Sequence, residues 1–369
     1  MSSNKKETKS AIEYKPKLTN EDACEIVKNL YGVNCVNISE LKAYDDKNYK
    51  INVENIINNK FIENICLDGY VLKIMNSLES KDIAFVEAQN RVMLYLAQNG
   101  IICPIPIKNV HGKYYSVEKI SNNYHVVRML EFVSGTIFCD VEITDYLFYC
   151  IGEYVAKLDQ LLKNFSVDGI DTHTSIWHMI CVPKLKEYYY CIKNDKHLNL
   201  INEIVDAFEQ NVQPNLHLLD KGVIHGDFNE QNIVVEKNLK NYWIIKGVLD
   251  FGDMNVAYYL FELAITIAYA IIHSKSIDMG GLVMAGYLAV RDVFEFEINL
   301  LKTCIAARIA QSLVLGAFAH EKDPSNMYVL TTQEHGWNML ELLWKIPNED
   351  LLYKWRVIGS NFSLPKDWK

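Results

Sequence analysis

The chain has 369 residues, of which 50% are apolar and 22% are charged, with 17 Gly and 8 Pro. This composition excludes disordered, collagen-like and low-complexity proteins, and the length provides enough material for one large or two smaller folded domains. The formal charge of −9 argues against nucleic acid or an anionic membrane surface as a partner, while it permits a cationic or amine ligand.

The cysteines and the first residues indicate a reducing compartment. The nine cysteines are odd in number and include no C-x-x-C pair, so neither a disulfide framework nor a zinc site is expected, and we predict free thiols. Residues 1–18 are predicted to be a flexible tail, which has neither the apolar core of a signal peptide nor the Arg-rich character of a transit peptide. We therefore expect a cytoplasmic protein.

Residues 19–130 are predicted to form a small amino-terminal lobe of sheet and helix. A first helix capped by Asn20 ends at the stop signal Gly32, and a second, over 80–100, has apolar residues at helical spacing. Short β-like runs separated by polar turns lie at 36–41, 48–53, 69–74, 105–109, 113–119 and 125–133. The order of these elements predicts an antiparallel sheet with one main helix.

Residues 131–369 are predicted to form a larger, mostly helical lobe, joined to the first by a hinge at 128–135. Helical periodicity marks residues 145–165, 256–272 and 303–319. The 256–272 run is short for a bilayer and carries Glu262, so it predicts a buried core helix and no membrane span. Residues 222–251 instead resemble strand, loop, strand, strand, loop. The fold class is therefore α+β.

One pair of motifs carries the chemistry of phosphoryl transfer, which needs a carboxylate to orient the attacking hydroxyl and oxygen ligands for Mg²⁺. His225-Gly226-Asp227 and Asn232 have the spacing H-x-D-x-x-x-x-N of kinase catalytic loops, and Asp250 opens a D-F-G sequence. We predict Asp227 as the catalytic carboxylate and Asn232 and Asp250 as metal ligands. His225 is expected to hold the loop backbone rather than to act as a base.

The amino-terminal lobe supplies candidates for nucleotide binding. Lys73 lies in the apolar strand GYVLKIM, which resembles the V-A-I-K strand of kinases. Glu87 lies on the apolar stripe of the following helix, so we predict that it pairs with Lys73; a surface position for Glu87 is the alternative. No G-x-G-x-x-G occurs between the first two strands, where Lys47 and Asn48 are candidate phosphate contacts, although turn chemistry explains this segment equally well.

These motifs resemble the aminoglycoside phosphotransferase and choline kinase-like family, whose catalytic loop begins H-G-D or H-N-D. The segments KAYDDKNY, YVLKI, VEAQN, HGDFNEQNI and LDFGDM are similar, along nearly the whole chain, to the branch of that family that phosphorylates 5-hydroxy-L-lysine. The resemblance implies a two-lobed protein kinase-like fold, GTP as donor, Mg²⁺ as cofactor and Asp227 as proton acceptor. From the residues alone, ATP remains an alternative donor.

The proposed acceptor carries two ammonium groups and one carboxylate, so its pocket should offer carboxylates and an arginine. The candidates are Asp253, Glu262, Arg308 and Glu230. For Asp253, Glu262 and Arg308 the alternative is an internal ion pair. Glu230 stands where the resemblance leads us to expect aspartate.

Two other functions remain open at this point. In the first, the chain is a kinase of another hydroxylated amine, namely homoserine, an aminoglycoside or an amino alcohol. In the second, it is a catalytically inactive kinase-like module that binds a nucleotide or partner. The presence together of Lys73, Glu87, Asp227, Asn232 and Asp250 argues against the inactive module.

Overall fold

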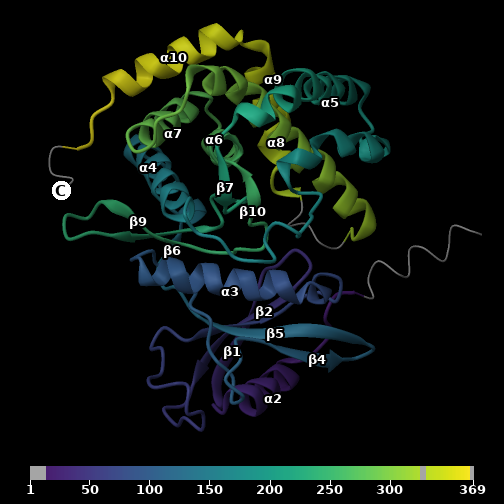
Figure 1. Cartoon of the computed structure of the whole chain (residues 1–369), viewed down its shortest axis with the longest axis vertical. Helices are drawn as coiled ribbons and strands as arrows, with labels where there is room; N and C mark the ends of the chain where they lie inside the picture. Colours follow the sequence, from purple (N-terminus) through teal and green to yellow (C-terminus); the bar gives the residue numbers. More distant parts are fainter. Residues whose placement is uncertain (1–13, 325–329, 366–369) are drawn as a thin grey trace, which may run out of the picture. The chain divides into compact units, whose positions relative to one another are not determined.

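The computed structural model describes residues 14–324 and 330–365 and divides into two compact units, Met1–Ser134 and Gly135–Lys369 (Figure 1). Of the predicted tail, residues 1–13 lie outside the described residues. Residues 14–18 are held against the rest of the first unit. Ser77 N donates to Tyr14 O (2.9 Å), Lys15 pairs with Asp45 (3.2 Å), and Leu18 packs against the core.

Among the described residues of the first unit, five strands form one antiparallel sheet in the order β1-β2-β3-β5-β4. They are β1 (Cys35–Leu41), β2 (Lys47–Val53), β3 (Tyr70–Ile74), β4 (Ser116–Ile120) and β5 (Asn123–Glu131). The expected strand at 105–109 is wrong apart from one bridge, between Pro106 and Leu130, where Ile107 N donates to Met129 O (2.9 Å) and Glu131 N donates to Ile105 O (2.8 Å). Further pairing along β5 is taken by β4, which begins opposite Val127.

The two helices of this unit are α2 (Asn20–Tyr31) and α3 (Ile83–Gln98), preceded by the short helix η1 (Glu79–Lys81). The cap of α2 is Thr19 rather than the predicted Asn20: the Thr19 and Asp22 side chains each accept from the other residue's backbone N–H, which satisfies two of the free donors at the helix start. Gly32, at φ +65°, ends α2 as predicted.

The two helices cover opposite faces of the sheet (Figure 1). Ala23, Val27 and Tyr31 of α2 pack against residues such as Leu72 and Ile74, whereas Val86 of α3 packs with Met75 and Val126. Because side chains alternate along a strand, Lys73 lies on the opposite face from Leu72 and Ile74. It therefore shares a face with α3.

The second unit holds two small sheets and most of the helices. Its strands pair antiparallel as β6-β8-β9 and as β10-β7. The strands are β6 (Thr136–Ile137), β7 (Lys221–Ile224), β8 (Ile233–Lys237), β9 (Trp243–Val248) and β10 (Asn255–Tyr258). The longer helices are α4 (Asp145–Leu162), α5 (Asp195–Ala207), α6 (Tyr259–Ser274), α7 (Asp278–Leu288), α8 (Glu295–Lys322), α9 (Gln333–Lys345) and α10 (Asn348–Asn361). Shorter helical segments are η2 (Phe138–Asp140), η3 (Met179–Cys191), η4 (Phe208–Val212) and η5 (Gln213–Leu218).

The core of the second unit is built on α6 and α8. The predicted helix over 256–272 begins only at Tyr259, because Val256–Tyr258 pair with β7 as strand β10. In the described part of the chain, α8 alone has the length and apolarity to cross a membrane, and 78% of its most apolar window is buried inside the fold, as in a core helix.

The strand pairing of this unit brings two loops together. Residues 225–232 join β7 to β8, and residues 249–254 join β9 to β10. Because β7 pairs with β10 and β8 pairs with β9, both loops leave paired strands at neighbouring ends. The backbone bond from Leu249 N to Asn232 O (2.8 Å) joins them directly.

Candidate active site

His225 ties the two loops to each other. Its Nε2 donates to the carbonyl of Leu249 (2.9 Å), and its Nδ1 accepts from the backbone N–H of Asp227 (3.3 Å). One ring nitrogen therefore donates while the other accepts, as in the neutral imidazole. This geometry agrees with the predicted positioning role.

Glu262, on α6, fixes the backbone of the same loop. Its side chain is completely buried, and its Oε2 accepts the backbone N–H of Gly226 (3.0 Å). Burial raises the pKa of this carboxyl above its ordinary value, and the hydrogen bond from the Gly226 N–H offsets only part of that rise. The prediction that Glu262 faces the substrate is therefore wrong, because its carboxylate is sealed beneath the loop.

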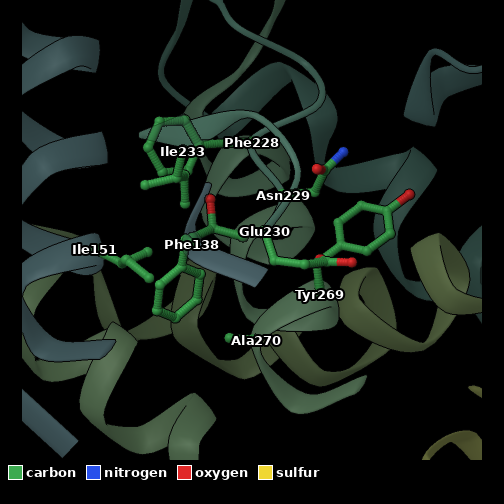
Figure 2. Close-up of a pocket in the computed structure, with 9 residues that line it drawn as sticks. Phe138, Ile151, Phe228, Asn229, Glu230, Ile233, Tyr269 and Ala270 are labelled. Atoms are coloured by element: carbon green, nitrogen blue, oxygen red, sulfur yellow. The ribbon is translucent and has the colours of Figure 1, made fainter. Parts of the chain in front are cut away.

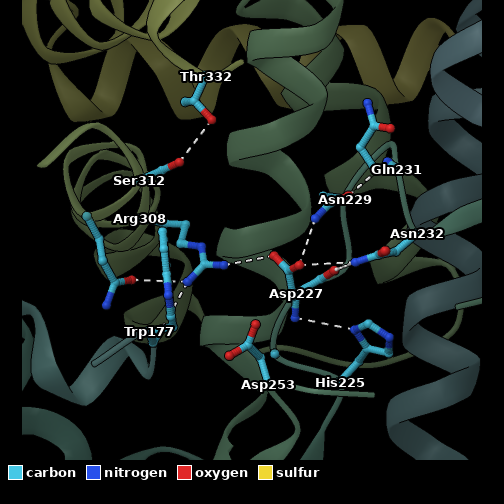
Figure 3. A network of polar contacts seen from close by, with 12 residues as sticks. Trp177, His225, Asp227, Asn229, Gln231, Asn232, Asp253, Arg308, Ser312 and Thr332 are labelled. Atoms are coloured by element: carbon cyan, nitrogen blue, oxygen red, sulfur yellow. Dashed lines mark hydrogen bonds and ion pairs between the residues drawn. The ribbon is translucent and has the colours of Figure 1, made fainter. Parts of the chain in front are cut away.

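The Asp227 carboxylate is held by three side chains (Figure 3). Oδ1 accepts from Arg308 Nη2 (2.9 Å), while Oδ2 accepts from Asn229 Nδ2 (2.8 Å) and Asn232 Nδ2 (3.0 Å). The side chain of Asp227 keeps 23% of its surface exposed. The carboxylate is thus fixed in orientation and still reachable by an acceptor.

Arg308 is almost completely enclosed, at 1% exposure. Its Nη1 donates to the carbonyl of Trp177 (3.0 Å) and to Gln311 Oε1 (3.1 Å), and its guanidinium lies 5.4 Å from the Tyr269 ring centre. Burial alone lowers its pKa, but Tyr269, Asp227 and nearby Asp253 raise the pKa above its ordinary value. The structure therefore corrects the expected clamp for a substrate carboxylate: this guanidinium is already paired with Asp227.

The predicted metal ligands offer oxygen atoms. Asn232 Nδ2 donates to both the backbone oxygen (2.9 Å) and the side chain of Asp227, which directs its Oδ1 away from that residue. Asp250 is exposed, has φ +55°, and its Oδ1 accepts from Gly252 N (3.2 Å). An amide oxygen and a carboxylate suit Mg²⁺, which completes its shell with phosphate oxygens and water.

No group of three or more His, Cys, Asp or Glu residues that could hold a metal ion occurs within 14–324 and 330–365. The residues present therefore fit a metal ion shared with a nucleotide rather than one caged entirely by protein.

Two other predicted substrate residues lie on the same loops. Asp253 follows D-F-G, and its backbone oxygen accepts from Asn255 Nδ2 (2.8 Å); the charge of its side chain contributes to the raised pKa of Arg308. Glu230 lies in the loop between Asp227 and Asn232 and lines a small cavity. Burial, aided by the charge of Asp227, raises its pKa to about 7.

In the first unit, Lys73 on β3 lies in a row of polar residues across one face of the sheet. Its register partners are Asn48 on β2 and Arg128 on β5. Its Nζ pairs with Asp46 (3.0 Å), whose other oxygen accepts from the backbone N–H of Asn76 (2.8 Å). Asp46, at the end of the turn between β1 and β2, is the residue that sequence reasoning missed.

The predicted ion pair between Lys73 and Glu87 is wrong. Glu87 is exposed, and its Oε1 accepts from the Tyr115 hydroxyl (3.3 Å). The buried side of α3 instead presents Val86, Gln89 and Asn90, so Glu87 lies outside that face. Arg128 Nη1 contacts Asn90 Oδ1 (3.4 Å).

The predicted phosphate contacts Lys47 and Asn48 lie on opposite faces of β2, because consecutive strand residues alternate. Asn48 shares the face of Lys73, and its Oδ1 is buried without a hydrogen-bond partner in the described residues. Lys47 lies on the other face and pairs with Glu40 (2.8 Å). Of the two, Asn48 alone is placed with Lys73.

Comparison with known proteins supports the prediction of a phosphotransferase that was made from these motifs. The phosphotransferase enzyme family, APH, matches residues 58–296. A hydroxylysine kinase of Xenopus laevis is 32% identical, with 94% of this chain and 96% of the relative covered. A hydroxylysine kinase of Danio rerio is 29% identical, with 96% and 99% covered.

Solved structures agree on the fold. The complex of amicoumacin kinase with AMP-PNP, Ca²⁺ and Ami has a TM-score of 0.64 at 15% identity, with 94% of this chain and 99% of that chain covered. The antiparallel sheet of the first unit and the helical second unit are those of a kinase-like α+β fold, which confirms the predicted fold class.

Proposed function

The chain belongs to the phosphotransferase enzyme family and is a small-molecule kinase, and we propose that it transfers the γ-phosphoryl group of GTP to the side-chain hydroxyl of 5-hydroxy-L-lysine. The products are then 5-phosphohydroxylysine and GDP. The choice of 5-hydroxy-L-lysine as acceptor rests on the similarity to hydroxylysine kinases over nearly the full length of both chains. GTP follows from the resemblance to that branch of the family.

On the acceptor side, Asp227 orients the hydroxyl and takes its proton. The hydroxyl oxygen forms the new bond to the γ-phosphorus while the bond from that phosphorus to the β,γ-bridging oxygen breaks, and the electron pair leaves with GDP. The bonds from Arg308, Asn229 and Asn232 fix the carboxylate before the acceptor arrives. Orientation matters most here, because phosphoryl transfer depends chiefly on positioning and charge stabilisation.

On the donor side, Asn232 and Asp250 would hold Mg²⁺, which neutralises charge on the phosphates when bound. Lys73 and Asn48, register partners on one face of the sheet, would bind phosphate oxygens. Asp46 keeps the Lys73 ammonium on that face. Glu87 has no part in this arrangement.

The test is nucleoside-diphosphate release by the purified full chain with Mg²⁺ and either GTP or ATP. The acceptors are 5-hydroxy-L-lysine, L-lysine, homoserine, choline and kanamycin. Turnover with GTP and hydroxylysine, and none with lysine, is the expected result, because lysine has the same charges but no acceptor hydroxyl. Preference for another acceptor would overturn the substrate while leaving the kinase chemistry, and faster turnover with ATP would overturn the donor.

A further inference from the structure

We propose that Glu230 and the cavity beside it form a subsite for a primary ammonium group of the acceptor, the one on the carbon next to the reacting hydroxyl. The inference rests on the proposed function and deepens it, since it assigns the residue that distinguishes an amine-bearing acceptor. In 5-hydroxy-L-lysine this group is the side-chain ammonium.

The cavity has the size and lining of an ammonium site (Figure 2). It leaves room for about one water-sized group, which is the size of an ammonium head. The residues around it are mainly apolar and aromatic and come from η2, α4, the 225–232 loop, β8 and α6. They are Phe138, Ile151, Phe228, Asn229, Glu230, Ile233, Thr266, Tyr269 and Ala270.

The Glu230 carboxylate lacks a hydrogen bond at one of its two oxygen atoms. Its Oε2 is buried and has no hydrogen-bond partner within the described residues. A buried carboxylate oxygen without a partner is unfavourable. A cationic ligand would supply the missing donor and compensate the charge.

The aromatic rings beside Glu230 favour the same ligand. Figure 2 shows the Glu230 side chain extending toward Tyr269, with Phe228 also lining the cavity. A ring face attracts a cation through its quadrupole. The Tyr269 ring already lies 5.4 Å from the Arg308 guanidinium, so selection of an ammonium over a neutral or anionic group depends on the Glu230 carboxylate first.

The cavity lies beside the reacting carboxylate. Asn229, which lines it, donates to Asp227 Oδ2 (2.8 Å). Glu230 is itself anchored, since its backbone oxygen accepts from Cys139 N (3.1 Å). In a vicinal amino alcohol the nitrogen and oxygen are on adjacent carbons. An acceptor whose hydroxyl reaches Asp227 therefore brings its neighbouring ammonium to the adjoining cavity.

The test compares two acceptors in two proteins. The second acceptor is 2-amino-5-hydroxyhexanoic acid, which is hydroxylysine with hydrogen in place of the side-chain ammonium. In Glu230→Gln we expect kcat/KM for hydroxylysine to fall about 10- to 100-fold, mostly through KM, because a charge-assisted hydrogen bond is lost. For the analogue we expect less than about a twofold change. The matched control is Glu236→Gln, at a carboxylate on β8 that pairs with Lys246 (3.0 Å); it should change neither value.

Each outcome decides the assignment. Equal losses for both acceptors would make Glu230 a structural residue, and no loss for either would make the cavity a water site; both overturn the subsite while the proposed function stands. If Glu230→Gln does not fold, Glu230→Asp keeps the charge and shortens its reach, and it should raise KM for hydroxylysine alone. Absence of hydroxylysine turnover by the unmodified protein would overturn the proposed function, and the subsite with it.

Discussion

Asp227 accepts hydrogen bonds at both carboxylate oxygens, and its proposed role lies on the acceptor side, so its substitution should separate catalysis from nucleotide binding. For Asp227→Ala we expect kcat to fall about 10²- to 10⁴-fold, because the acceptor-side carboxylate is removed. The affinity for GTP, measured by calorimetry, should change less than about twofold. An equal loss of nucleotide affinity would contradict the assigned role.

Arg308 and Asp227 form a buried pair (2.9 Å) whose members differ in exposure, at 1% and 23%. Arg308→Met should lower the free energy of unfolding by about 2–4 kcal/mol, since Asp227 loses its counter-charge while Trp177 O and Gln311 lose a donor. Urea unfolding of Arg308→Met, Asp227→Asn and the double variant measures the coupling. We expect the double variant to lose less than the sum of the singles; strict additivity would contradict a stabilising pair.

At the scale of an element, the conformation of the loop from β7 to β8 requires glycine at position 226. Gly226 has φ +81°, and a Cβ there would lie 2.3 Å from the carbonyl oxygen of Asp253. Gly226→Ala should therefore combine backbone strain with displacement of the 249–254 loop, lowering stability by about 2 kcal/mol or more and reducing kcat.

Gly100 provides the matched control for this loop. Its φ is +83°, but nothing lies within 4 Å of a Cβ built there. Gly100→Ala should lower stability by only about 1 kcal/mol in thermal or urea unfolding, with kcat unchanged. Equal effects of the two substitutions would show that the close approach to Asp253 is unimportant.

A buried carboxyl pair joins α4, α6 and α7. Asp159 on α4 accepts from the Tyr287 hydroxyl on α7 (2.6 Å), and Asp159 and Glu262 are both fully buried. Burial raises the pKa of both carboxyls, and Glu262 raises that of Asp159 further. The folded protein therefore holds protons that the unfolded chain releases above about pH 4.

The sign of the pH dependence follows from this difference. As pH rises above about 4, the unfolded state binds fewer protons than the folded state at these carboxyls, so their contribution to stability falls. In urea unfolding at pH 5 and pH 8, the unmodified protein should lose more stability than Asp159→Asn, which lacks one titrating group. Parallel pH profiles for the two proteins would contradict the raised pKa of Asp159.

At the scale of the whole molecule, binding of nucleotide and metal to the folded state must raise its stability. At 100 times the dissociation constant, GTP with Mg²⁺ should add about 2.7 kcal/mol, seen as a higher Tm in a thermal scan. Removal of Mg²⁺ with a chelator should reduce the shift, because the role proposed for Asn232 and Asp250 is to bind the phosphates through a metal ion. An unchanged shift after chelation would argue against these two residues as metal ligands.

The same scan tests which residues bind phosphate. Lys73→Ala should reduce the GTP-dependent shift, while Lys47→Ala is the matched control, since Lys47 lies on the opposite face of β2 and pairs with Glu40. Equal effects of the two lysines would contradict the role proposed for Lys73.

The order of elements and the catalytic motifs could be predicted from the sequence because both depend on local spacing. Strand alternation and helical periodicity indicated β1, β2, β3, α2, α3, α4 and α8, and the loop from His225 to Asn232 was expected between two strands, where it lies. The predicted cap of α2, Asn20, was one residue away from the observed cap, Thr19. The error at Val256–Tyr258 arose because an apolar run adjoining a helix has no periodic signal of its own, and pairing with β7 makes it a strand.

The partners of the site residues depended on the tertiary structure. Arg308 lies 81 residues from Asp227 and Glu262 lies 36 residues from Gly226, so only the packing of α6 and α8 brings them to the loop. Glu87 was expected to face inward, but a rotation of 100° per helical residue places Val86 and Asn90 inside and Glu87 outside. The sequence by itself determined the family and the position of its kinase-like motifs, because these lie in short local patterns. The fold decided which charges meet, because a buried charge pairs with whatever long-range packing places beside it.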